Sequence, residues 1–161
     1  DNVRPVYFRK SCNEGGDVYT ETARYTYAQD GLCKAQMRKN YMDGRVKERT
    51  ESSRTAVYDM VSVMGYARAM NTSGMKEGQH IDFRLVDAAE ILDECLIYQG
   101  KETVKLSGKK YNCLVFKLVE PYMEKGKNKF RDILTIYITD DNARKIVQRG
   151  LNYIIVRRIK V

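Results

Sequence analysis

The chain has 161 residues, of which 43% are hydrophobic and 31% charged, and its formal net charge is +8 at pH 7. This is the composition of an ordinary globular protein, and it excludes a disordered tail, a coiled coil and a collagen. The sequence has no run of about 18 apolar residues, so it predicts no transmembrane segment. The basic residues are spread along the chain rather than clustered, which makes nucleic acid an unlikely partner.

The first third of the sequence predicts a meander of antiparallel strands. The apolar run Val6–Phe8 predicts a first strand, and the alternation of β-branched and aromatic residues over 17–28 predicts a second. Asp30-Gly31 and Asp43-Gly44 are hairpin signals, because both positions of such a turn must tolerate a positive φ. They predict further strands over 32–42 and 45–51.

A change of periodicity then predicts one principal helix over 56–70. Five apolar residues fall on one helical face: Val57, Met60, Val61, Met64 and Ala67. The Ser and Thr residues at 52–55 are suitable N-caps for such a helix. We expect Met60 and Met64 to be buried against the sheet, with Asp59 and Ser62 facing outward.

Strands resume after the helix and continue to the end of the chain. The pattern predicts a strand over 79–86, then a long bent strand over 91–106 with a bulge at Gly100. Further strands are expected over 111–119, where Pro121 would stop the strand, and over 130–139, 145–148 and 151–161. The expected fold is mainly β, a curved antiparallel sheet with one principal helix, in one domain over residues 1–161.

The cysteine and histidine content argues against a metal site. The four cysteines are Cys12, Cys33, Cys95 and Cys113, each in an apolar, strand-like run. Their even number permits two disulfides with three connectivities, but free, buried thiols are the favoured interpretation, above all for Cys113. There is no CxxC pair, and the single histidine, His80, at a strand start, is interpreted as a surface residue or one satisfied by hydrogen bonds. We therefore expect no metal and no cofactor.

The sequence also offers no catalytic constellation. There is no GxSxG elbow and no phosphate-binding glycine loop, and a Ser or Cys nucleophile would have to use the single histidine, His80, as its base. The adjacent carboxylates Asp93 and Glu94 would point to opposite faces of a strand, which is a poor geometry for acid and base catalysis. The sequence predicts a protein that is not an enzyme.

Several short motifs, in order, resemble an uncharacterised family of bacterial cell-envelope proteins. They are Val3–Phe8, Val57–Ser62 with Tyr66–Arg68, Gly100–Glu102, Tyr111–Cys113 and Ile138–Arg144. The resemblance implies a periplasmic or envelope-associated location and a fold similar to that of lipoprotein carriers (LolA/LolB-like), a half-open barrel wrapped around helices. It also implies that this chain lacks N-terminal strands of a longer protein, which would expose one sheet edge.

Two functions follow from this resemblance as expectations. The first is a non-enzymatic binding protein for a lipid or an acylated partner, held in an apolar cavity on the concave face of the sheet. The candidate lining residues are Met60, Met64, Tyr66, Ile136, Ile138 and Ile154. The alternative is a structural or interaction module of the cell envelope that contacts a protein or an anionic polymer.

Overall fold

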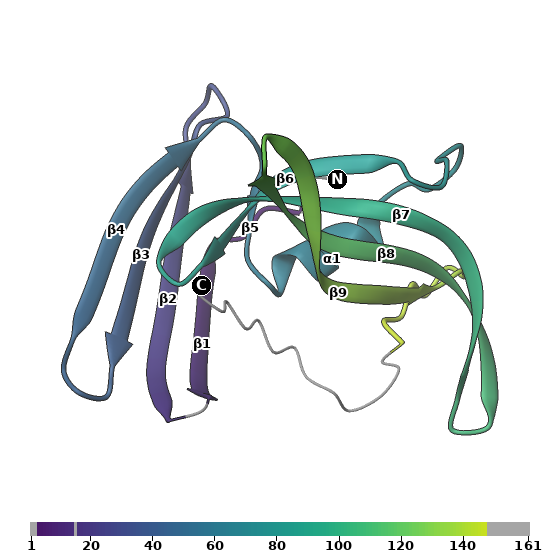
Figure 1. Ribbon diagram of the computed structural model, residues 1–161, viewed down its shortest axis with the longest axis horizontal. Coiled ribbons are helices and arrows are strands. Elements are labelled where there is room, and N and C mark those ends of the chain that lie inside the picture. The colour runs from purple at the N-terminus through teal and green to yellow at the C-terminus, as the bar shows by residue number, and fades with distance from the viewer. Residues whose placement is uncertain (1–2, 15, 148–161) are drawn as a thin grey trace. The chain divides into compact units, whose positions relative to one another are not determined.

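The computed structural model describes residues 3–14 and 16–147, which form a mainly β fold with two sheets and one short helix (Figure 1). The four-stranded sheet consists of β1 (Tyr7–Glu14), β2 (Asp17–Tyr27), β3 (Cys33–Tyr41) and β4 (Val46–Ser53), in that order. The five-stranded sheet consists of β5 (Val57–Tyr58), β6 (His80–Asp87), β7 (Glu90–Leu106), β8 (Lys109–Glu124) and β9 (Lys127–Thr139). The helix α1 spans Ser62–Ala69. The predicted fold class is confirmed, although the strands divide between two sheets.

The described residues form two compact units. The first unit comprises the described residues within 1–66 and 83–93, and it therefore contains the whole four-stranded sheet. The second unit comprises those within 67–82 and 94–161, including most of β7 and all of β8 and β9.

The four-stranded sheet is the antiparallel meander that the hairpin signals predict. In β3, buried and exposed residues alternate from Cys33 to Lys39, as expected for a strand with one covered face. The inner face holds an apolar cluster within the first unit, which includes Phe8, Ala23, Tyr25 and Met37. The outer face carries mostly polar and charged side chains. Alternation of this kind fixes the strand register, because a shift by one residue would expose the whole apolar set.

One row of the inner face is charged rather than apolar. The antiparallel register places Lys10 opposite Glu21, Glu21 opposite Lys39, and Lys39 opposite Lys47. Glu21 is fully buried, with 0% of its surface exposed. Lys39 is also buried, and its Nζ atom lies 3.6 Å from the ring centre of Tyr19, a cation–π contact.

This charged row holds the turn between β6 and β7, residues 87–90, within the same unit. The ammonium of Lys10 donates to Asp87 at 2.7 Å and lies 3.3 Å from Glu21 Oε2, while Glu21 Oε1 accepts the backbone N–H of Ala89 at 2.8 Å. Lys47 donates to the carbonyl of Ala88 at 3.1 Å and to the carboxylate of Glu90 at 2.8 Å. Every residue of the turn is therefore held by a side chain of the four-stranded sheet.

The predicted helix is shorter than expected, and its N-terminus differs. Val57 and Tyr58 are buried and form β5, which pairs in parallel with β6. Asp59 then caps the helix: its carboxylate accepts the N–H groups of Val61 and Ser62, while Ser62 Oγ accepts the N–H of Asp59. The expectation that Asp59 faces outward is wrong because this carboxylate is needed at the cap, where it is buried.

The long strands of the second sheet confirm one prediction and correct another. β7 is one strand with a register shift between Tyr98 and Lys101, which is the bulge expected at Gly100, and β7 and β8 are visibly curved (Figure 1). Pro121 does not stop β8, which continues to Glu124. The pairing of β8 with β7 runs from Lys109 to Val119, so Pro121, which lacks an N–H, lies past its end.

The remaining expectations concern the cysteines and the C-terminal strands. Cys12, Cys33, Cys95 and Cys113 are all free thiols, and Cys113 is buried beside Val104 as expected. In the predicted strand 145–148, Ile146 forms an isolated antiparallel bridge with Ile138. The predicted strand 151–161 lies outside the described residues. None of the helices in the described part of the chain is long and apolar enough to cross a membrane.

The bulge at Gly100 gives a first testable prediction. Gly100 has a φ of +86°, which strains any other residue, and a Cβ atom at this position would collide with the carboxylate of Glu77. We expect Gly100→Ala to lower the free energy of unfolding by about 1–2 kcal/mol in urea melts.

Gly65 is the matched control for this substitution. It lies inside α1, where an added Cβ would make an ordinary contact with Val3 at 3.6 Å. Gly65→Ala should raise the free energy of unfolding by about 0.5–1 kcal/mol, because alanine favours helix. Equal effects of the two substitutions would contradict the bulge assignment.

Buried phenols in the first unit give a second prediction. Burial, reinforced by the neighbouring Tyr66, raises the pKa of Tyr58 to about 12. Burial also raises the pKa of Tyr25, with a further contribution from the Asp59 carboxylate. Since an ordinary tyrosine has a pKa of about 10, the folded state holds these protons more tightly than the unfolded state. The free energy of unfolding should therefore fall as the pH rises from about 10 to about 12.

Tyr58→Phe should make this loss less steep, because the substitution removes one of the buried phenols that must ionise. Urea melts over the alkaline range measure the slope. Tyr7→Phe, which removes an exposed phenol, is the control, and its slope should equal that of the wild type. An unchanged slope in Tyr58→Phe would show that this phenol ionises as readily in the folded protein as in the unfolded chain.

Candidate functional site

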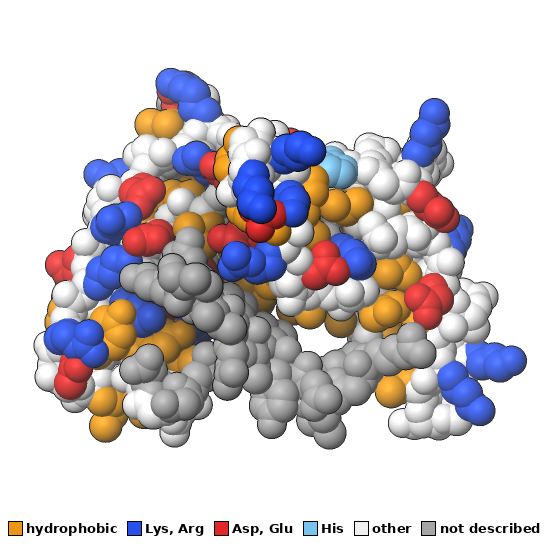
Figure 2. All heavy atoms as spheres, in the orientation of Figure 1, with side chains coloured by type: hydrophobic (Ala, Val, Ile, Leu, Met, Phe, Trp, Pro, Cys, Tyr) orange, Lys and Arg blue, Asp and Glu red, His pale blue; other side chains and the backbone are white. Residues whose placement is uncertain are grey.

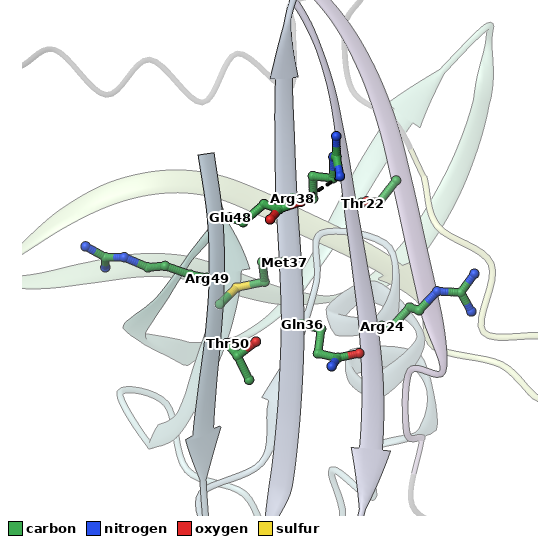
Figure 3. Close-up of a pocket in the computed structure, with 8 residues that line it drawn as sticks. All are labelled: Thr22, Arg24, Gln36, Met37, Arg38, Glu48, Arg49 and Thr50. Carbon is green, nitrogen blue, oxygen red and sulfur yellow. Dashed lines mark hydrogen bonds and ion pairs between the residues drawn. The ribbon is translucent and has the colours of Figure 1, made fainter. Parts of the chain in front are cut away.

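The outer face of the four-stranded sheet forms a shallow groove of about 420 Å³ (Figure 3). It is lined from strands β2, β3 and β4 by Thr22, Arg24, Gln36, Met37, Arg38, Glu48, Arg49 and Thr50. Strand alternation decides which side chains can meet a ligand there. In Figure 3 the side chains of Arg24 and Arg49 extend in opposite directions. By alternation Arg24 belongs to the outer face, whereas Arg49 and Met37 belong to the inner face.

Positive charge dominates this outer face. By alternation its charged side chains are the basic Arg9, Arg24, Lys34 and Arg38 and the acidic Glu48, all of them exposed. Arg38 and Glu48 form an ion pair at 2.6 Å, the contact drawn in Figure 3, which leaves three basic groups in excess. An exposed pair of this kind contributes little to stability and can rearrange for a ligand.

Neutral groups on the same face can also bind a ligand. Thr22, Gln36 and Thr50 offer hydroxyl and amide groups that donate and accept hydrogen bonds. Tyr7 is exposed in the neighbouring strand β1, and the guanidinium carbon of Arg24 lies 5.1 Å from the centre of its ring. The outer face therefore combines charge, hydroxyl and amide groups and, beside the groove, one aromatic ring.

A second pocket, of about 260 Å³, lies at one end of the first unit. Its lining includes Arg4, Tyr27, Cys33, Arg54 and Tyr58. The Tyr27 hydroxyl donates to the carbonyl of Pro5 at 2.9 Å, and Arg54 pairs with Asp30 at 2.9 Å, so both polar groups are engaged in the fold. Burial raises the pKa of the Cys33 thiol, which makes this cysteine a poor nucleophile.

The candidate lining residues of the expected apolar cavity belong to different units. Met60 is buried, Met64 and Tyr66 are partly buried, and all three lie in the first unit. Ile136 and Ile138 are buried in β9, in the second unit. Ile154 lies outside the described residues. The two pockets above are lined by other residues, so an apolar ligand cavity stays a prediction.

A potential metal-binding cluster occurs in the second unit, where the sequence predicted none. It consists of His80, Asp82 and Cys95, whose donor atoms lie within 4.8 Å of one another. Sequence reasoning missed it because Cys95 comes from the neighbouring strand. The one local signal was the spacing of His80 and Asp82, which places both side chains on one face of a strand.

On the face shown in Figure 2, Lys and Arg side chains are interspersed with Asp and Glu and do not form a continuous basic stripe.

The two sheets and the groove define a class: a mainly β protein with a polar, basic groove on one sheet face. The chain belongs to the family of proteins of unknown function DUF3108, whose model matches residues 1–150. No curated protein matches the chain, and no solved structure matches it either. The family match confirms the expected relation to an uncharacterised domain.

Proposed function

We propose that this protein is a non-enzymatic binding module of the bacterial cell envelope that holds an anionic polysaccharide against the outer face of β1–β4. The groove lined by Arg24, Gln36 and Arg38 is the observation that carries the proposal. The envelope location rests on the family resemblance of the sequence motifs.

The chemistry of the groove favours a sugar polymer with negative charges. Guanidinium groups bind carboxylates and sulfates or phosphates with paired hydrogen bonds, and the hydroxyl and amide groups of Thr22, Gln36 and Thr50 complement sugar hydroxyls. The strands that carry these groups are paired along their length, so the backbone positions of these residues are fixed. An extended polymer can lie along such a flat sheet face, whereas a small substrate would need a deeper pocket.

Dextran sulfate and uncharged dextran are the matched probes for this proposal. The protein should bind dextran sulfate and not dextran, with an affinity that falls as salt is added, because the contacts are between exposed charges. Isothermal titration calorimetry measures both. The double variant Arg24→Gln, Arg38→Gln should bind dextran sulfate at least about tenfold more weakly, since each lost contact removes on the order of 1 kcal/mol.

The control variant removes two exposed charges from the β7–β8 hairpin of the second unit, Lys105→Gln with Lys110→Gln. It has the same net charge as the groove variant and should bind dextran sulfate like the wild type. Equal weakening in both double variants would mean that binding follows net charge alone, and this result would overturn the groove as the site.

A second candidate function, carriage of a lipid or an acylated partner, is favoured by one observation. Beside the start of α1, Val61 is 69% exposed, and Met64 and Tyr66 are covered only in part. Binding of a fluorescent fatty acid that Met64→Gln abolishes, together with no binding of dextran sulfate, would favour this function over the first.

A further inference from the structure

The cluster of His80, Asp82 and Cys95 is independent of the groove, since it lies in the second unit. His80 and Asp82 are two residues apart at the start of β6, so their side chains project from the same face. Cys95 lies in β7, the strand next to β6 in the sheet. One donor atom from each residue lies within 4.8 Å of the other two: an imidazole nitrogen, a carboxylate oxygen and a thiol sulfur.

These three donors are the protein ligands that zinc accepts. Calcium and magnesium prefer sites made of oxygen alone, whereas a set that mixes nitrogen, oxygen and sulfur favours a borderline-soft ion. We propose that His80, Asp82 and Cys95 bind one zinc ion, with a fourth position open to water or to a further donor. Three protein ligands with one open position are a common arrangement of zinc.

The geometry needs a modest adjustment to bind the ion. With bonds of about 2.0–2.3 Å in a tetrahedral site, neighbouring donor atoms lie about 3.5 Å apart. Since the donor atoms lie within 4.8 Å of one another, no separation must close by more than about 1.3 Å. His80 and Asp82 are exposed and can rotate their side chains, whereas Cys95, 1% exposed, is fixed in the strand. The two outer ligands would therefore close onto a fixed sulfur.

The surroundings favour a cation at this place. Among residues 3–14 and 16–147, no Lys or Arg lies within ion-pair distance of Asp82, so no fixed positive charge competes for this carboxylate. The ring of Phe130 in β9 packs edge-on against the imidazole of His80, with ring centres 5.1 Å apart. An apolar ring beside a ligand also keeps water from one side of the site.

A catalytic thiol is the competing interpretation of a cysteine beside a histidine and an aspartate, and burial argues against it. A substrate carbonyl cannot reach a sulfur whose residue is 1% exposed. A single ion approaching past the exposed His80 and Asp82 needs much less room. On binding, the zinc–sulfur bond replaces the S–H bond, and the proton leaves to solvent.

Cobalt(II) substitution in the full chain tests the site. Chelator-treated protein is titrated with Co²⁺, which gives a thiolate-to-metal charge-transfer band only if sulfur is a ligand, and then with Zn²⁺, which should displace it. We expect one metal ion per chain. Cys95→Ser should remove the charge-transfer band, and His80→Gln and Asp82→Asn should each weaken Zn²⁺ binding at least about tenfold.

Two controls keep the outcome decisive. Cys12→Ser removes a partly exposed thiol in the other sheet, and Asp93→Asn removes an exposed carboxylate in β7; both variants should bind like the wild type. Because His80 and Asp82 are exposed, their variants test the site even if Cys95→Ser fails to fold. The proposal is overturned if the wild type shows no charge-transfer band, or if His80→Gln and Asp82→Asn bind Zn²⁺ as tightly as the wild type, which would indicate an adventitious ion only.

Discussion

A fully buried carboxylate, that of Glu21, is the constraint on which the first unit depends. It accepts the backbone N–H of Ala89 at 2.8 Å and lies 3.3 Å from the ammonium of Lys10, which in turn donates to Asp87. Burial alone would lower the pKa of Lys10, but the carboxylates of Asp87 and Glu21 outweigh it and raise this pKa above its ordinary value. Removing one member of such a buried set costs about 3–5 kcal/mol, because the remaining charge stays buried without its partner.

The turn that this network holds has an unfavourable backbone. Ala88 and Ala89 have φ values of +51° and +56°, in a region that glycine and asparagine usually occupy. Alanine is nevertheless suited to position 89, since its methyl group is buried in the apolar cluster of the inner face. Contacts from Lys10, Glu21 and Lys47 offset the strain, and Arg49 lies 3.5 Å from Glu90. Because the inner face is occupied in this way, the outer face of β1–β4 is the side of this sheet that we assign to a ligand.

The sequence predicted those parts of the fold that depend on local signals. The two Asp-Gly hairpins and the alternation in β2 predicted the meander, and Gly100 predicted the bulge in β7. The predicted strands left a break at 87–90, but not the conformation of this turn: Ala88 and Ala89 are not usual turn residues, and the N–H of Ala89 is bonded by Glu21, 68 positions earlier in the chain. The helix start was misplaced because Val57 fits the helical period as well as it fits a short buried strand, and Asp59 was not recognised as the cap.

The candidate sites were harder to predict than the fold, because each of them brings together residues from different strands. Arg24 and Arg38 come together only through the pairing of β2 and β3, and Cys95 meets Asp82 only through the order of β6 and β7. A single histidine was taken as an argument against zinc, yet one imidazole is sufficient when a carboxylate and a thiol complete the set. Pairing between strands, which a single sequence leaves open, decided both sites.

Hydrogen exchange at the amide of Ala89, measured by NMR, tests the central claim most directly. This amide belongs to a turn, so without its bond to Glu21 it would exchange quickly. Our account predicts a protected Ala89 amide in the wild type and exchange about ten- to a hundredfold faster in Glu21→Met, since a hydrogen bond to a charged group contributes about 1.5–3 kcal/mol. The amide of Phe116 in β8 should be unaffected as long as the substitution leaves the second unit folded. An Ala89 amide that exchanges quickly in the wild type, or equally slowly in Glu21→Met, would contradict the account.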